Sequence, residues 1–260
     1  MRATDVLVTP SDLERRWPAL EGVAAINVDL RAAAVDLAAA RVDGAVFLGC
    51  TFPPGAAERL VANGAAVLSH PGGVPFPVYR ASLYSPDELT GGHDADPGTS
   101  LDARITAWFH SSSSTSLTDL VVRALHDATI DAATARFVAG RRVVGVMGGH
   151  ALARDDDLYR EVAGLGRELT RRGFTVATGG GPGVMEAANL GAWCAPLEDA
   201  ALDGAVAMLS DAPVYGDDPS AHIGRARDVR VRWPDGGVSL GVPTWIYAHE
   251  PTSGFATHIA

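Results

Sequence analysis

The sequence predicts an α/β fold in which helices cover both faces of a parallel sheet. Short apolar runs alternate with stretches of helical periodicity, which is typical of parallel strands joined by crossover helices. Two of these runs, 142–147 and 174–178, flank one helical stretch and together have the length of a βαβ unit. Glycine-rich loops follow both runs, as in Rossmann-like folds, which bind ligands at the carboxyl ends of their strands.

Length and periodicity divide the chain into three parts. With 260 residues and 47% apolar content, it has room for one large domain or two small ones. We expect a small N-terminal α/β domain with a Pro- and Gly-rich connector at 1–100, a helical connector at 101–140, and a Rossmann-like domain at 141–260.

The N-terminal domain is predicted from three apolar runs and two helical stretches. Strands are expected at 24–28, 45–49 and 66–69, and helices at 30–40 and 55–62. Proline and glycine are frequent in the segments that follow, 70–77 and 91–98, so these are expected to be loops.

A long helix is predicted in the connector. Ser116 and Asp119 have the spacing of a capping box, and Gly140 is a plausible C-terminal stop. Between them, apolar residues recur at helical spacing and form one face: Leu117, Leu120, Val121, Ala124, Leu125 and Ala128. We expect this face to need a partner, because the connector itself has few apolar residues to cover it.

The third part contains the clearest pattern. The continuous apolar run 142–147 is suited to a strand covered on both faces, and 174–178 is the next strand. Between them a helix is expected to begin at the aspartates 155–157, which neutralise its N-terminal dipole, and to bury Leu158, Val162, Leu165 and Leu169. A further parallel strand is expected at 244–247.

The glycine loops indicate an anion site. The residues 179–183 leave a predicted strand and enter a helix, with Pro182 in its first turn. Glycines allow positive φ and close backbone approach, and free N–H groups at a helix N-terminus favour phosphate. The dinucleotide fingerprint fits poorly, because Val184 or Glu186 stands where its third glycine is required.

These motifs resemble those of a known family. The runs VVGVMGGH, LYREV and FTVATGGGPGVMEAANLGA are similar to the first half of the LOG-type nucleotide-monophosphate phosphoribohydrolases, long labelled lysine decarboxylase-like, and most of all to the larger pyrimidine/purine nucleotide 5′-monophosphate nucleosidases. The resemblance covers about 142–192 strongly. It implies hydrolysis of the N-glycosidic bond of a nucleoside 5′-monophosphate to free base and ribose 5-phosphate, in a homodimer or larger assembly.

The resemblance places the nucleotide on both glycine loops. The implied binding residues are Gly148, Gly149, His150, Gly179, Gly180, Gly181, Gly183, Met185 and Glu186. The family's second signature, PGGxGTxxE, which supplies a phosphate cradle and a catalytic glutamate, does not occur in this sequence. We therefore expect either a fragment of a longer protein or a shortened homologue without catalysis, and a non-catalytic nucleotide-binding or regulatory protein is the alternative function.

The catalytic candidate is Glu186, near the start of the helix that follows the second glycine loop. Cleavage of a glycosidic bond passes through an oxocarbenium-like state, which a nearby carboxylate stabilises. A carboxylate that only interacts with the helix dipole is an equally good interpretation of Glu186. His150 could bind base or phosphate or cap a turn, and His249 and Glu250 form either a rim pair or a turn before Pro251.

Composition excludes several other classes. The net charge of −10 disfavours nucleic acid and anionic membranes as partners, including the single-stranded DNA-binding relatives of this fold. The sequence contains no lysine, so pyridoxal phosphate and P-loop chemistry are excluded. Cys50 and Cys194 lack metal-ligand spacing, and Asp217 and Asp218 indicate a turn, so no metal or other cofactor is expected. With no apolar leader or membrane span, we expect a cytoplasmic protein.

Overall fold

The computed structural model describes residues 6–31, 33, 35–36, 39–91, 97–111, 116–245 and 252–260. Within them the chain is an α/β protein with two parallel sheets flanked by helices, which confirms the predicted Rossmann-like fold class. The chain divides into two compact units, residues 1–82 with 113–137, and residues 83–112 with 138–260. The segment 101–140, expected to be a helical connector, is shared between the two units.

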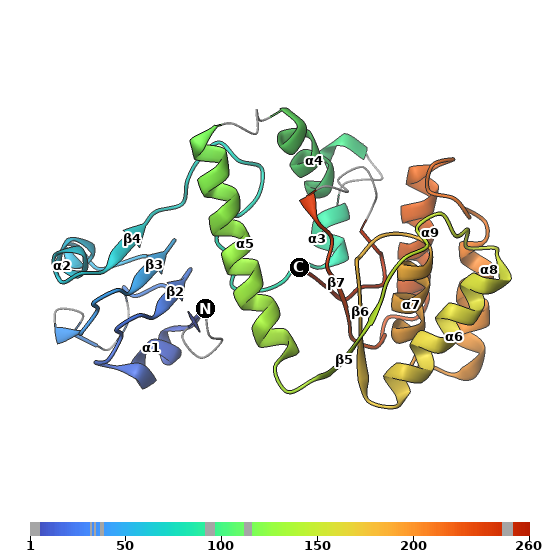
Figure 1. Cartoon of the computed structure of the whole chain (residues 1–260), viewed down its shortest axis with the longest axis horizontal. Coiled ribbons are helices and arrows are strands. Elements are labelled where there is room, and N and C mark those ends of the chain that lie inside the picture. The colour runs from blue at the N-terminus through green and yellow to red at the C-terminus, as the bar shows by residue number, and fades with distance from the viewer. Residues whose placement is uncertain are drawn as a thin grey trace. The chain divides into compact units, whose positions relative to one another are not determined.

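The first unit contains four short parallel strands that pair in chain order (Figure 1). They are β1 (Val6–Leu7), β2 (Ala24–Ile26), β3 (Val46–Leu48) and β4 (Ala66–Leu68), and they are accompanied by α1 (Pro10–Arg16) and α2 (Ala56–Ala62). The strands predicted at 24–28, 45–49 and 66–69 and the helix at 55–62 are confirmed. Their core is apolar and includes Leu13, Ile26, Phe47 and Leu60.

The helix predicted at 30–40 is wrong, because the described residues of this segment form turns, irregular backbone and, at Ala39, a 3₁₀ turn. The Ala33 N–H donates to the Leu30 carbonyl and the Ala39 N–H to the Asp36 carbonyl, as in isolated turns, and other backbone groups bond to distant parts of the chain. The Leu30 N–H donates to the Thr51 carbonyl, and the Arg41 N–H donates to the Pro18 carbonyl. Leu30 and Ala40 are buried in this arrangement, so lateral packing overrides the helix propensity of the alanines.

Helix α5 (Leu117–Val138) begins and ends where the sequence predicts. The Ser116 hydroxyl accepts the Asp119 N–H at 3.4 Å, and Gly140 follows the helix at φ 74°. The apolar face predicted from periodicity is largely exposed, and Leu117 is 76% exposed. The opposite face carries the buried residues, which are Val122, His126, Thr129, Ile130, Ala132 and Ala133.

The second unit contains the other parallel sheet, again in chain order. Its strands are β5 (Arg142–Val146), β6 (Phe174–Thr178), β7 (Ser239–Gly241) and β8 (His258–Ile259). Helices α6 (Asp157–Arg171), α7 (Val184–Trp193), α8 (Asp199–Leu209) and α9 (Pro219–Arg232) gather on one side of it (Figure 1). The unit also contains α3 (Pro86–Thr90), a 3₁₀ turn (Pro97–Thr99) and α4 (Leu101–Ser111).

Two strand predictions for this unit need correction. The strands at 142–147 and 174–178 are present, but β5 lies at the sheet edge and Val143 is 41% exposed, so β5 is not covered on both faces. The next strand is β7 at Ser239–Gly241 rather than 244–247, where Trp245 is in a 3₁₀ turn and residues 246 and 247 lie outside the described part. Strand β7 has only three residues, of which Leu240 is the one large apolar residue, so the sequence does not show the apolar run that predicts a strand.

Helices α6 and α7 pack closely because small residues face one another. A Cβ atom on Gly191 would lie 1.9 Å from the Ala163 carbonyl oxygen, and one on Gly166 would lie 2.3 Å from that of Ala188. Asp156 caps α6 as predicted, by accepting the Leu158 N–H at 2.8 Å. The predicted buried stripe is wrong at Leu158 and Leu165, which are about half exposed, because the contact with α7 uses the adjacent small residues instead.

Among the described residues, no helix combines the length and the apolarity that are needed to cross a membrane.

Candidate functional site

The site is formed where three loops leave the carboxyl ends of parallel strands. The loop 148–150 follows β5, 179–183 follows β6, and 242–244 follows β7. Parallel strands bring their carboxyl ends to one edge of the sheet, so the three loops meet there. The segment that leads into β8 joins them, because the Ser253 N–H donates to the Gly180 carbonyl at 2.6 Å.

Two of the predicted glycines hold the first and second loops together. The Val184 N–H donates to the Gly149 carbonyl at 3.1 Å, and a Cβ on Gly183 would lie 2.1 Å from that same oxygen. Gly183 has φ 70° and is the N-cap of α7, so Pro182 precedes the cap and does not lie in the first turn. A side chain at 183 would separate the loops, which explains the glycine without any ligand.

Two cavities open along this rim. The first, of about 250 Å³, is lined mainly by the glycine loops and by the segments around β7 and β8: Met147, Gly148, His150, Gly179, Gly180, Gly181, Met185, Val242, Pro243, Thr244 and Thr252. The second, of about 350 Å³, is lined by His150, Ala151, Leu152, Ala153, Pro182, Gly183, Pro213, Val214, Tyr215, Gly216 and His222. We call them the glycine cavity and the tyrosine cavity. His150 lines both cavities. Gly181 lines the glycine cavity, and the next residue, Pro182, lines the tyrosine cavity.

Most of the binding residues predicted from sequence line these cavities. Six of them line the glycine cavity, namely Gly148, His150, Gly179, Gly180, Gly181 and Met185, and Gly183 lines the tyrosine cavity. Gly149 lines neither, because it packs against Val184. Glu186 lines only a third, much smaller cavity beside Pro182 and His222. Their roles in binding stay predictions.

Glu186 is held in a buried ion pair. Its carboxylate, on a residue only 2% exposed, accepts two hydrogen bonds from Arg154, to Oε2 at 2.9 Å and to Oε1 at 2.6 Å. The Tyr159 hydroxyl donates to Oε2 at 3.0 Å. Arg154 also donates to the His222 carbonyl at 2.9 Å, so the pair links the β5–α6 loop, α6, α7 and α9.

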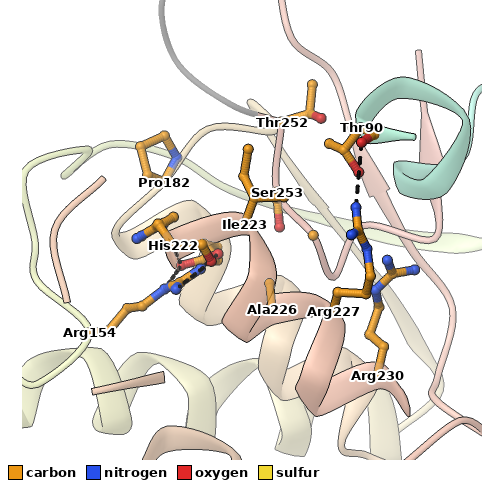
Figure 2. A pocket seen from close by; sticks show the side chains of 12 residues that line it. Thr90, Arg154, Pro182, His222, Ile223, Ala226, Arg227, Arg230, Thr252 and Ser253 are labelled. Atoms are coloured by element: carbon orange, nitrogen blue, oxygen red, sulfur yellow. Dashed lines mark hydrogen bonds and ion pairs between the residues drawn. The ribbon is translucent and has the colours of Figure 1, made fainter. Parts of the chain in front are cut away.

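This ion pair fixes the charge of Glu186. Burial opposes ionisation of the carboxyl, but Arg154 and Tyr159 outweigh it, and the pKa of Glu186 lies below its ordinary value. Both oxygens are occupied, and the carboxylate contacts neither of the two larger cavities. Figure 2 shows Arg154, His222 and Pro182 on one side of the third cavity and Thr90, Arg227 and Arg230 on the other. In this arrangement Glu186 organises the loops that line the site.

The remaining candidates are placed as follows. His249 and Glu250 lie outside the described residues. The arginines 225, 227, 230 and 232 lie on helix α9, and Arg230 pairs with Asp87 on α3. Asp218 caps α9 through the Ala221 N–H at 2.9 Å. In the described part of the chain, no group of three or more His, Cys, Asp or Glu residues is arranged to hold a metal ion.

Sequence reasoning missed Arg154 and His222. Tyr159 lies within the quoted LYREV run, so a motif marked its neighbourhood. Arg154 and His222 lie 68 positions apart, and only the fold brings them together. No local pattern distinguishes an arginine beside three aspartates, or a histidine in the first turn of a helix, from surface residues.

Comparison with known families matches part of the chain. No curated protein and no solved structure gives a significant match to the chain. Residues 141–195, which contain β5, α6, β6, α7 and both glycine loops, match the family model described as the SLOG cluster4 family. This stretch is similar to a superfamily that includes LOG-like proteins, and the match indicates a nucleotide-related function in broad terms.

Proposed function

We propose that this chain binds a nucleoside 5′-monophosphate across the glycine and tyrosine cavities. The observation that carries the proposal is that the two cavities adjoin at His150, on the strand ends where Rossmann-like folds bind nucleotides. The similarity of 141–195 to the SLOG cluster4 family supports it, because this stretch supplies both glycine loops. Together the cavities give a nucleotide one compartment for phosphate and another for its base.

The glycine cavity is the phosphate compartment. Its walls include backbone groups of the glycine loops, which are donors suited to phosphate. Thr252 also lines this cavity, and its buried Oγ1 has no hydrogen-bond partner among the described residues. Backbone and hydroxyl donors bind phosphate without a lysine.

Hydrolysis of the N-glycosidic bond is the second candidate, and the resemblance to nucleotide nucleosidases favours it. That reaction needs a carboxylate near the anomeric carbon. Among the described residues, no Asp or Glu lines either larger cavity, and both oxygens of Glu186 are occupied. The described residues therefore support nucleotide binding and do not supply a carboxylate for hydrolysis, while the predicted candidate Glu250 lies outside them.

The first prediction separates the two candidates. Titration of AMP, CMP, GMP and UMP in a calorimeter is expected to give saturable binding for at least one of them. Chromatography of the same mixtures is expected to show no free base above a protein-free blank, because no described carboxylate contacts the larger cavities. Absence of binding to all four would contradict the proposal. Release of base with ribose 5-phosphate would instead support the hydrolase.

The second prediction tests the glycine cavity. Gly181→Val adds a branched side chain to a residue that lines it, so nucleotide affinity is expected to fall at least tenfold while the fold persists. Gly164→Val is the matched control, because Gly164 lies on α6 with open space beside it. Equal affinities of the two variants in calorimetry would remove the loop from the site.

We also propose that the chain forms a homodimer or larger assembly. Leu117, Leu120 and Val121 lie exposed along α5, and solvent exposure of such a stripe is unfavourable. Light scattering at micromolar concentration is expected to give at least twice the mass of 27.0 kDa. Leu117→Glu with Leu120→Glu is expected to lower that mass. A monomeric mass for the unmodified chain would contradict the proposal.

A further inference from the structure

We propose that Met147 is a peroxide-sensitive site at the glycine cavity, and that its oxidation to the sulfoxide weakens nucleotide binding. Met147 is the last residue of the apolar run that precedes the first glycine loop. The effect on binding rests on the proposed function, whereas the reactivity of the side chain does not.

Met147 is exposed because of its place at the end of an edge strand. The preceding residue, Val146, packs against the apolar core that includes Val176 and Ala188, so the next side chain projects from the opposite face of the sheet. Met147 is 70% exposed there, although methionine is an apolar residue that folding usually buries. The side chain is therefore open to dissolved peroxides.

Met147 also forms part of the wall of the glycine cavity. It lines this cavity together with Gly148, Gly179 and Met185. The two methionines meet beside Gly179, where an added Cβ would lie 3.2 Å from the Met147 Cε and 2.9 Å from the Met185 Sδ. A chemical change at the Met147 sulfur therefore alters the compartment that we assign to phosphate.

The reaction with hydrogen peroxide is a two-electron oxidation of the thioether. A lone pair of the Met147 sulfur attacks one peroxide oxygen, and the O–O bond breaks as the S–O bond forms. The transferred oxygen gives its proton to the departing hydroxide, which leaves as water. The product is a methionine sulfoxide, which is polar and can be reduced again by enzymes that use thiols.

The other described sulfur groups are less accessible or less reactive. Met185 is half-buried in the first turn of α7, and Met208 on α8 packs against a buried apolar cluster. Burial raises the pKa of both Cys50 and Cys194 to about 11, so near pH 7 they remain thiols, which are poor nucleophiles toward peroxide. We therefore expect Met147 to be oxidised before these four residues.

The added oxygen changes what the cavity wall offers to an anion. A thioether sulfur is only a weak hydrogen-bond acceptor, whereas a sulfoxide oxygen is a strong one, as are the oxygens of a phosphate. The sulfoxide can therefore compete with phosphate for the backbone N–H groups of the glycine loops, and its oxygen repels those of the phosphate. Oxidation is expected to weaken nucleotide affinity by about tenfold.

The test first locates the oxygen and then measures binding. The unmodified chain is treated with limiting hydrogen peroxide, and peptide mass spectrometry identifies which methionine has gained one oxygen. Calorimetric titration of AMP, CMP, GMP and UMP before and after treatment is expected to show the loss of affinity for every nucleotide that the untreated chain binds. Methionine sulfoxide reductases with dithiothreitol, which remove the oxygen as water, should restore the affinity.

Variants assign the effect to the Met147 sulfur. Met147→Leu has no sulfur at this position, so its affinity, whatever its value, should be the same before and after peroxide. Met208→Leu is the matched control, because it removes a methionine that lines neither larger cavity, and it should keep the sensitivity to peroxide. Met147→Gln places a polar oxygen at the wall, so without peroxide it should bind more weakly than Met147→Leu. Thermal unfolding verifies that the variants fold.

The outcomes distinguish this inference from the function on which it rests. Oxidation of Met185 or Met208 before Met147, or unchanged affinity of a chain fully oxidised at Met147, overturns the inference and leaves nucleotide binding in place. An equal loss of affinity in peroxide-treated Met147→Leu also overturns it. Failure of the untreated chain to bind any of the four nucleotides overturns both. The measurements on the unmodified chain decide the question even if Met147→Leu does not fold.

Discussion

Replacing Glu186 by alanine is expected to lower the free energy of unfolding by about 3–5 kcal/mol. The substitution leaves the guanidinium of Arg154, which is 1% exposed, as an uncompensated charge in the protein interior. It also removes the acceptor of the Tyr159 hydroxyl. Urea unfolding of the purified variant measures the change, and a loss below about 1 kcal/mol would show that solvent reaches Arg154 and replaces the carboxylate.

A control within the same unit isolates the effect of burial. Arg160 and Asp203 form an ion pair at 2.6 Å between α6 and α8, but both side chains are 59% exposed. Asp203→Ala is therefore expected to cost less than about 1 kcal/mol. The double variant Arg154→Met/Glu186→Leu should recover much of the stability lost by either single change, because it removes both buried charges together.

The ion pair also gives a pH dependence of known sign. The pKa of Glu186 is lower in the folded chain than its ordinary value of 4.5. Its contribution to stability is therefore fully present above pH 4.5 and is lost as pH falls through the lowered pKa. Glu186→Gln lacks this titration, so the stability difference between it and the unmodified chain should shrink in acid.

The parts of the site that depend on a few consecutive residues were predictable from the sequence. Strands 142–146 and 174–178, the glycine loops after them and the Asp156 cap each have a signal within a few residues. Arg154 and His222 beside Glu186 have no such signal, because the Arg154 guanidinium reaches the carboxylate from another loop. His222 approaches from α9, which is separated from α7 in the sequence by α8. A carboxylate at the start of a helix therefore looked like a catalytic or dipole-neutralising group in the sequence, and only the fold shows it paired.

Helix faces were less predictable than helix positions. Periodicity identifies the large apolar residues, and on α6 it selected Leu158 and Leu165, which are half exposed. The real contact with α7 uses Ala163, Gly166 and Gly191, whose small side chains let two backbones approach closely. A pattern based on hydrophobicity gives glycine little weight, so it does not detect an interface that depends on small volume rather than apolar area.

Gly191→Ala is therefore expected to destabilise the chain by roughly 3 kcal/mol, although alanine is the better helix former. The added Cβ would lie 1.9 Å from the Ala163 carbonyl oxygen and 2.6 Å from the Arg167 nitrogen, so α6 and α7 must separate. Gly164 also lies on α6 but has open space beside it. Gly164→Ala is therefore expected to raise the free energy of unfolding by about 0.5–1 kcal/mol. Because α7 carries Glu186 and begins at the second glycine loop, the first variant should also weaken nucleotide binding. Opposite signs in urea unfolding support the close helix contact, and a stabilised Gly191→Ala chain would contradict it.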